Sequence, residues 1–169
     1  AEYYYAHIFD MLYHYDVPIP PFATDKLLAN NGSMLNEGVE FGLGITPIQS
    51  KDWELNLNVN LTWSRNKLLS LDGDYRGFRL RAPNITSGGG LNGAGFHGGN
   101  NNVLYQIVGQ PLGVFYLPHS TGLRTDAKGK RHYAIADLNH DGNVDLSDGG
   151  DRYIAGQATP KIILGSNLS

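Results

Sequence analysis

The acidic segment DLNHDGNVDLSD at residues 137–148 has the residue types and the spacing of a calcium-binding loop. In the twelve-residue EF-hand pattern, oxygen-bearing side chains stand at positions 1, 3, 5, 9 and 12, the carbonyl of position 7 is a ligand, and a glycine makes the sharp turn at position 6. Hard oxygen ligands at alternating positions of a tight loop are what Ca²⁺ requires. The predicted ligands are Asp137, Asn139, Asp141, the carbonyl of Asn143, Asp145 and Asp148.

Two features of this loop leave its metal occupancy open. Position 12 is an aspartate, Asp148, which is one methylene shorter than the glutamate that binds Ca²⁺ through both oxygens. No helix-forming pattern flanks the loop. The alternative is a metal-free turn rich in Asp and Asn, although its four aspartates would then repel one another without compensation. We expect a Ca²⁺ cofactor that makes the loop rigid, bound with the weak affinity of extracellular modules.

The other chemical signals along the chain are weak. GAGFHG at 93–98 matches G-x-G-x-x-G, but the dinucleotide-binding motif needs a strand before it and a helix after it, and neither is indicated here. A flexible loop is the better interpretation. The six histidines show no metal-binding spacing, and neither a serine–histidine–acid arrangement nor G-x-S-x-G can be identified. The sequence therefore predicts that the chain is not an enzyme.

Aromatic side chains in the central region could stack on sugar rings, or they could pack a small core within the loops themselves. The second arrangement is the commoner one, and we expect it here. The residues concerned are Tyr75, Phe78, Phe96, Tyr105, Phe115 and Tyr116.

The composition excludes several classes of protein. The 169 residues carry a formal net charge of −3, which argues against a nucleic-acid partner, and the absence of cysteine excludes disulfides and a thiolate site. No run approaches the roughly 20 apolar residues of a transmembrane helix. The first residues, AEYYYAHIFDML, have no features of a secretion signal, so the signal of an exported protein is expected outside this stretch.

The alternating segment WELNLNVNLTWS at residues 53–64 gives the best indication of the fold. Every second side chain is apolar from Trp53 to Trp63, and three of the polar ones between them are asparagine. Period two indicates a strand, because successive side chains leave a strand on opposite faces. Twelve residues at roughly 3.3 Å each exceed the usual strand of about 5–6 residues and suit a tilted strand that crosses a bilayer. The alternative is a long strand of a soluble β-domain.

Similar patterns predict strands on either side of this segment. GVEFGLGIT at 38–46 is joined to it by the short connection 47–52, which predicts an antiparallel hairpin. Residues 1–12 and 161–169 are further predicted strands, whereas the proline-containing stretch 13–36 is predicted to be a loop.

Residues 70 to 160 show turns, glycines and only short apolar islands, VLYQIVG at 103–109 and LGVFYL at 112–117. Long loops at one edge and short turns at the other are typical of outer-membrane barrels. About four strands cannot close even the smallest such barrel, which has about eight. We therefore expect this chain to be a piece of a larger one.

Taken together, these segments resemble the C-terminal part of SusC/RagA-type TonB-linked outer-membrane proteins, which are TonB-dependent receptors. The order and spacing of the segments agree over nearly the whole chain. In the last of them, DGGDR carries two glycines where the family more often runs directly from the last acidic residue to the arginine. The segments are NNGSMLNEGVEFGLG at 30–44, NVNLTWSRNKLLSL at 58–71, VGQPLGVFY at 108–116 and ADLNHDGNVDLSDGGDRYIAGQATPKIILGSNLS at 136–169.

The resemblance implies an all-β fold in which residues 1–169 are part of an antiparallel transmembrane β-barrel. About four strands would belong to a barrel of 22 strands with an N-terminal plug, and residues 70–160 would form a long extracellular loop region that includes the calcium loop. The resemblance also implies nutrient uptake of oligosaccharides or peptides across the bacterial outer membrane in Bacteroidota. A SusD-like lipoprotein would be the extracellular lid, and TonB would supply energy through regions outside this chain.

In that arrangement the apolar face of 53–64 meets outer-membrane lipid, the asparagine face lines a hydrated lumen, and the turn 47–52 is periplasmic. The competing hypothesis is a secreted, calcium-stabilised β-domain that binds carbohydrate. It requires the apolar face to be covered by another sheet, and this requirement distinguishes the two.

Overall fold

The computed structural model describes residues 1–90 and 102–169, and these residues form strands and loops without any helix. None of them therefore belongs to a helix long and apolar enough to cross a membrane. The motif at 93–98, together with Phe96, lies outside the described residues. The strands are β1 (Glu2–Asp16), β2 (Lys26–Gln49), β3 (Glu54–Ser70), β4 (Gly73–Tyr75), β5 (Phe78–Leu80), β6 (Ile85–Gly90), β7 (Asn102–Ile107), β8 (Val114–Pro118), β9 (Ser120–Thr125), β10 (Arg131–Ile135), β11 (Arg152–Gln157) and β12 (Ile162–Leu168).

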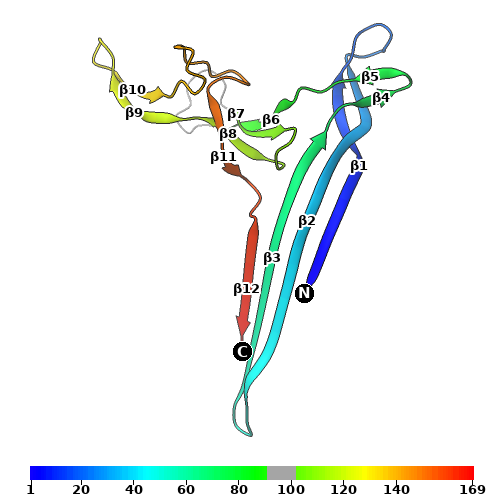
Figure 1. Cartoon of the computed structure of the whole chain (residues 1–169), viewed down its shortest axis with the longest axis vertical. Helices are drawn as coiled ribbons and strands as arrows, with labels where there is room; N and C mark the ends of the chain where they lie inside the picture. The colour runs from blue at the N-terminus through cyan, green and yellow to red at the C-terminus, as the bar shows by residue number, and fades with distance from the viewer. Residues whose placement is uncertain (91–101) are drawn as a thin grey trace. The chain divides into compact units, whose positions relative to one another are not determined.

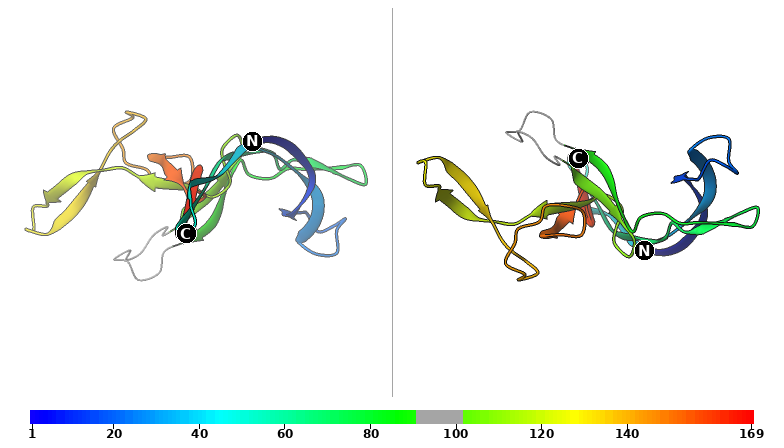
Figure 2. Two further views of the ribbon diagram at one scale, coloured as in Figure 1. Left: turned by 90° about the horizontal axis from the view of Figure 1, so that it is seen from below. Right: turned by 90° about the horizontal axis from the view of Figure 1, so that it is seen from above.

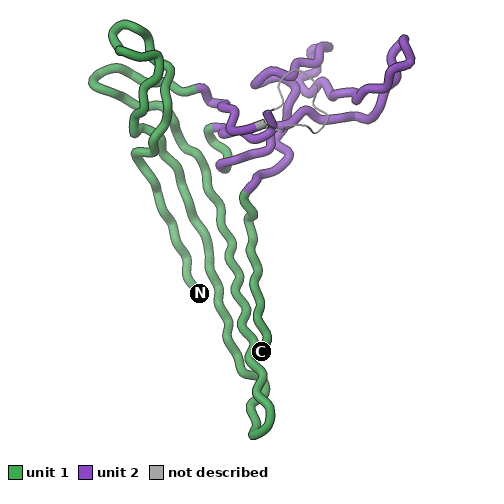
Figure 3. Tube along the Cα trace, turned by 180° about the vertical axis from the view of Figure 1, so that it is seen from behind, with its two compact units in different colours: residues 1–82, 108–111, 159–169 green, residues 83–107, 112–158 purple. Residues whose placement is uncertain are grey.

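The chain divides into two compact units, shown in different colours in Figure 3. Unit 1 comprises residues 1–82, 108–111 and 159–169, and unit 2 comprises 83–107 and 112–158. Unit 1 contains a long four-stranded sheet in the order β1-β2-β3-β12 and the small β4–β5 hairpin, whereas unit 2 contains a sheet in the order β11-β8-β7-β6 and the β9–β10 hairpin (Figure 1). All the strand pairs are antiparallel.

The predicted hairpin of 38–46 and 53–64 is confirmed as part of β2 and β3, which pair along most of their length. Its turn is closed at Ser50, whose N–H donates to the Trp53 carbonyl at 2.7 Å and whose hydroxyl oxygen accepts the Trp53 N–H at 3.0 Å. The predicted C-terminal strand is also confirmed, because β12 pairs with β3 from Ile162 opposite Trp63.

The predicted loop at 13–36 is wrong over most of its length. Strand β1 continues to Asp16 and β2 already begins at Lys26, so the connection holds only residues 17–25, which include the prolines. The poor strand formers of NNG at 30–32 lie in β2 because its backbone pairs with β1, and Gly32 lies beside a register shift at Met11. A Cβ at Gly32 would lie 2.8 Å from the Met11 Cβ. In this segment the hydrogen-bonded pairing with β1 outweighs the low strand propensity of Asn30, Asn31 and Gly32.

One face of the sheet in unit 1 is apolar and uncovered. Cross-strand pairs on β2 and β3 place aliphatic and aromatic side chains directly opposite one another, and β12 extends the same rows. The β2 members, Val39 to Ile45, are each between 39% and 44% exposed, and Leu164 on β12 is 68% exposed. Within unit 1, these side chains of β2 and β12 therefore stay exposed. The pairs are Val39 with Trp63, Phe41 with Leu61, Leu43 with Val59 and Ile45 with Leu57.

The opposite face of the same strands combines glycine with asparagine. Gly42 and Gly44 of β2 lie opposite Asn60 and Asn58 of β3. A Cβ would lie 3.3 Å from the Asn60 Oδ1 at the first glycine and 2.9 Å from the Asn58 Oδ1 at the second. The asparagine side chains therefore lie over β2, and glycine leaves the space that they need.

The region from 70 to 160 has more structure than the sequence predicted, because β4 to β11 lie within it. The two apolar islands form β7 and β8, and Tyr105, Val114 and Tyr116 make a buried cluster in unit 2. Tyr75 packs against a separate cluster in unit 1 around Tyr15. The expectation that these loop aromatics pack a core within the loops is confirmed for Tyr105 and Tyr116. Tyr75 packs instead against residues that include Tyr15 of β1 and Ala29 of β2, whereas Phe78 is 46% exposed and Phe115 is 36% exposed.

The close packing at Gly38 of β2 leads to a prediction. Gly38→Ala should lower the free energy of unfolding by about 1–3 kcal/mol, because the new Cβ would lie 2.5 Å from the Trp63 carbonyl oxygen and 2.6 Å from the Tyr4 hydroxyl oxygen. Gly165→Ala on the same face is the control, since nothing lies within 4 Å of its Cβ. Urea unfolding of the full-length protein measures both variants, and an equal loss in the two would contradict the packing argument.

Candidate metal-binding loop and its anchor

The segment between β10 and β11 in unit 2 contains all six predicted calcium ligands. Asp137 is partly buried, and the others are exposed. The sharp turn predicted at the sixth position is present, because Gly142 has a φ of +86°, which favours a residue without a Cβ. The six residues are Asp137, Asn139, Asp141, Asn143, Asp145 and Asp148.

The first half of the loop is held by its own side-chain oxygens. Asp137 accepts the backbone N–H of Asp141 at 3.2 Å and that of Gly142 at 2.8 Å. The amide oxygen of Asn139 accepts the Asp141 N–H at 3.0 Å. The Asp141 carboxylate in turn accepts the Asn143 N–H at 2.8 Å. These are local turns of the kind that Asp and Asn favour.

In the second half of the loop, Asp145 accepts the Ser147 N–H at 2.9 Å and the Ser147 hydroxyl at 2.7 Å. These two donors hold the pKa of Asp145 below its usual range, so its carboxylate is ionised at neutral pH. Asp148 lies 3.4 Å from the guanidinium of Arg152. The predicted last ligand is thus paired with a cation.

Asp151 closes the loop from inside. It is fully buried, and its carboxylate accepts backbone N–H groups from Leu138 at 2.6 Å, Asn139 at 3.3 Å and Asp145 at 2.8 Å. The N–H groups, that of Asp145 first, hold the pKa of Asp151 below its usual range although burial opposes this. A single carboxylate therefore joins the start of the loop to its end.

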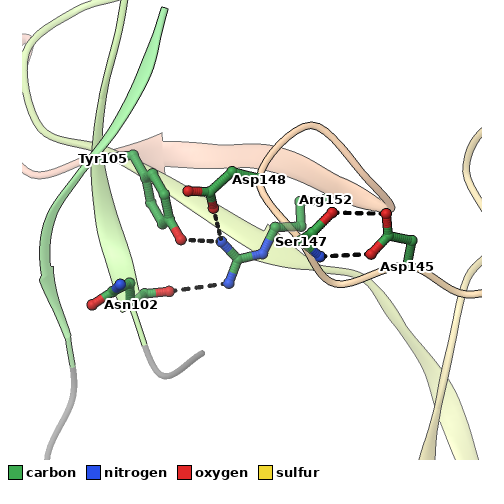
Figure 4. A network of polar contacts seen from close by, with 6 residues as sticks. All are labelled: Asn102, Tyr105, Asp145, Ser147, Asp148 and Arg152. Atoms are coloured by element: carbon green, nitrogen blue, oxygen red, sulfur yellow. Dashed lines mark hydrogen bonds and ion pairs between the residues drawn. The ribbon is translucent and has the colours of Figure 1, made fainter. Parts of the chain in front are cut away.

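Arg152, the first residue of β11, connects the loop to the sheet (Figure 4). Its side chain is only 2% exposed. The guanidinium donates to the Tyr105 hydroxyl and to the Asn102 carbonyl, the latter at 3.2 Å. It also lies 5.0 Å from the ring centre of Tyr105 and 5.6 Å from that of Tyr116, within the range of cation–π attraction. The same cation thus contacts the aromatic cluster and the Asp148 carboxylate.

The donor atoms fit Ca²⁺ in kind but are not gathered around one point. Over residues 1–90 and 102–169, no three His, Asp or Glu side chains converge closely enough to hold a metal ion. The loop oxygens accept hydrogen bonds from backbone N–H groups of the loop itself. The structure thus brings the predicted ligands into one loop without forming a finished coordination shell.

Sequence reasoning ended the loop at Asp148 and did not identify Asp151 or Arg152 as its anchors. The signal was the unusual DGGDR, in which two glycines separate the two aspartates. Gly149 has a φ of +94°, and a Cβ at Gly150 would collide with the Asp145 carbonyl oxygen. Both glycines are required by this turn, which places the second aspartate inside the loop.

Comparisons with known proteins agree with the resemblance drawn from the motifs. No family model matches the chain. TonB-dependent receptor SusC of Bacteroides thetaiotaomicron is 27% identical over 158 residues, which are 92% of this chain and 14% of that protein. A chain in the structure of the RagAB peptide importer in the "closed-closed" state matches 97% of this chain and 17% of its own length, with a TM-score of 0.56 and 20% identity.

These comparisons confirm the similarity to SusC/RagA-type proteins and the all-β antiparallel fold. The likeness to the importer structure is one of fold, given its low identity. The chain spans only 14% of the length of the curated relative.

Asp151 leads to a prediction about loop order. In EDTA, Asp151→Asn in the full-length protein should speed amide hydrogen exchange by about tenfold or more on one side of the loop, either at Leu138 and Asn139 or at Asp145. The carboxamide keeps one acceptor oxygen and turns its NH₂ group toward the N–H groups that the other oxygen had bound. Mass spectrometry of exchange in peptides covering the loop measures the effect. Asp148→Asn is the control and should change little, since Asp148 makes one contact of 3.4 Å. Unchanged exchange in the Asp151 variant would show that the loop does not depend on this carboxylate.

Proposed function

We propose that this chain is a barrel segment of an outer-membrane TonB-dependent importer of the SusC/RagA type. The uncovered apolar face of the four-stranded sheet is the observation that carries the proposal. A soluble domain would have to bury such a surface, whereas lipid covers it in a membrane barrel. The similarity to a TonB-dependent receptor and to a chain of a peptide importer supports this role, and neither name describes an enzyme.

The two faces of the sheet suit the two sides of a barrel wall. Rows of Val, Leu, Ile and Phe with Trp63 at one end face lipid, and the glycine–asparagine face lines the hydrated lumen. Asparagine offers hydrogen bonds to water and to a plug without adding charge. The short turn at 50–53 is then periplasmic, and residues 70–160, which join β3 to β12, are extracellular.

The partners follow from this role. A SusD-like surface lipoprotein acts as the lid, and TonB supplies energy through parts of the protein beyond this segment. The transported substrate is an oligosaccharide or a peptide. The names of the two similar proteins support the coarse class of receptor or importer, and the name RagAB peptide importer gives a peptide cargo for that protein.

Calcium is the proposed structural ion of the loop at 137–148. The six predicted ligands supply oxygen atoms at the spacing of a calcium loop, and the sharp turn of the loop is formed at Gly142. Asp151 and Arg152 hold the loop to the sheet without metal, so Ca²⁺ would order the exposed side chains of the loop, Asn139, Asp141, Asn143, Asp145 and Asp148.

The lipid-facing assignment predicts different effects at neighbouring positions. Leu57→Arg, opposite Ile45, should cost about 2–4 kcal/mol of unfolding free energy in the full-length barrel, as charges at the bilayer midplane do. Asn58→Arg, on the glycine–asparagine face, should cost much less. Reversible unfolding from lipid vesicles measures both variants.

Equal costs at the two positions would contradict a lipid-facing sheet. That result would instead support a soluble β-domain buried on both faces, such as a secreted calcium-stabilised carbohydrate-binding module.

Calcium binding predicts a saturable site of low affinity. Titration of the full-length protein with Ca²⁺ should give a dissociation constant of about 10⁻⁴–10⁻³ M, and Asp141→Ala should abolish this site. Asp52→Ala, an exposed aspartate in the β2–β3 turn, is the control and should leave binding unchanged. Isothermal calorimetry measures the affinity. If millimolar Ca²⁺ gives no binding, or if both variants bind like the wild type, the loop is a metal-free turn held by Asp151.

A further inference from the structure

The β9–β10 hairpin of unit 2 has no core of its own. It forms a separate two-stranded sheet, and every residue of β9 is exposed. Figures 1 and 2 show it extending away from the other strands of unit 2. An isolated two-stranded hairpin is at best marginally stable in water, because neither face is buried. To be stable, the β9–β10 hairpin therefore needs a surface to pack against.

One face of the hairpin carries paired large side chains. Leu123 and Tyr133 lie directly opposite each other and therefore share a face, on which they are 59% and 70% exposed. The next pair on this face is Thr125 with Arg131. Tyrosine and arginine are the residues most often found at energetically dominant positions of protein interfaces.

The hairpin is positively charged within a negatively charged chain. Residues 120–135 contain four Lys or Arg and one Asp, a net charge of +3, whereas the whole chain carries −3. Asp126 is used inside the turn, where its carboxylate accepts the backbone N–H groups of Lys128 and Lys130 at 2.9 Å each. Among the described residues, none of the four cations forms an ion pair. They are Arg124, Lys128, Lys130 and Arg131.

We propose that this hairpin is a docking arm for an acidic patch on the surface lipoprotein, with Tyr133 and Leu123 as its apolar anchors. This inference rests on the importer role proposed above. The four cations steer the acidic partner, and Arg131, on the same face as the apolar pair, adds charge that disfavours a basic surface. Burial of Leu123 and Tyr133 supplies the packing that the hairpin lacks.

Limited trypsin digestion of the full-length wild-type protein tests the docking without any substitution. Trypsin should cut at Lys128, Lys130 and Arg131 in the protein alone, and added lipoprotein should protect these bonds. Protection without the lipoprotein would mean that another part of the same chain, or a second copy of it, covers the hairpin, and this would overturn the proposal. Cleavage at an unchanged rate in the presence of a lipoprotein that binds would also overturn it.

Binding of the lipoprotein to the full-length protein in detergent, measured by surface plasmon resonance, tests the residues. Tyr133→Ala should weaken binding by about 30-fold or more, which is the effect of removing a dominant interface side chain, and Tyr133→Phe should retain most of the affinity. The double variant Arg124→Glu, Arg131→Glu should slow association in a salt-dependent manner.

Arg79→Glu in β5 of unit 1 is the matched charge control, since Arg79 is also exposed. It should leave the association rate unchanged. Equal slowing by Arg79→Glu would mean a general electrostatic attraction and would overturn the role of the hairpin.

Absence of any lipoprotein binding by the wild type would instead refute the proposed function itself. Tight binding of the hairpin to anionic lipid vesicles, with lipoprotein affinity unchanged in all variants, would assign it to the membrane surface and overturn the protein interface.

Discussion

The register between β2 and β3 is the constraint on which the main sheet depends. Because side chains alternate strictly, a slip of one residue would exchange the two faces of a strand. The observed register sets Phe41 against Leu61 and Gly42 against Asn60, so both strands turn the same kind of residue to the same side. The pairing of β12 with β3 preserves these rows across a long excursion of the chain. One register therefore decides both which face meets lipid in the proposed barrel and which face meets water.

Side-chain volume refines this arrangement on the polar face. Glycines in β2 leave room for the asparagines of β3, and the Cβ distances at Gly42 and Gly44 show that larger residues would crowd the asparagine amide oxygens. Glycine weakens an isolated strand, but here its loss of side-chain contact is offset by neighbours that lie over it. From Gly38 to Gly44, β2 thus has large apolar residues on one face and, apart from Glu40, only glycine on the other, which suits a barrel whose interior must accommodate water and a plug.

Unit 2 is held together by a different principle, namely buried charged groups with polar and aromatic partners, although the Nε of Arg152 has no hydrogen-bond partner among the described residues. Asp151 accepts three backbone N–H groups, and the adjacent Arg152 is inserted among Tyr105, Tyr116 and Asp148. Buried ionised groups are tolerated only when such partners surround them. Asp151 accepts hydrogen bonds from the acidic loop, and the adjacent Arg152 contacts the aromatic cluster. The loop and the cluster are therefore fixed to two neighbouring residues of the chain. The exposed part of the loop and the β9–β10 hairpin lie outside these contacts.

Local pattern and local spacing were enough to predict the strands at 38–46, 53–64 and 161–169, the short turn between the first two, the apolar islands that became β7 and β8, and the six candidate ligands in one loop. These features depend on period two or on a compact motif, which neighbouring residues determine by themselves. The strand character of 26–36, the pairing of β12 with β3, and the anchoring by Asp151 and Arg152 could not be predicted in this way. Each of them depends on residues distant in the chain. Cross-strand hydrogen bonds outweigh the poor strand preference of Asn30 and Asn31. The buried Asp151 carboxylate has its N–H donors only in the folded loop, because they come from residues 6 to 13 positions earlier in the chain.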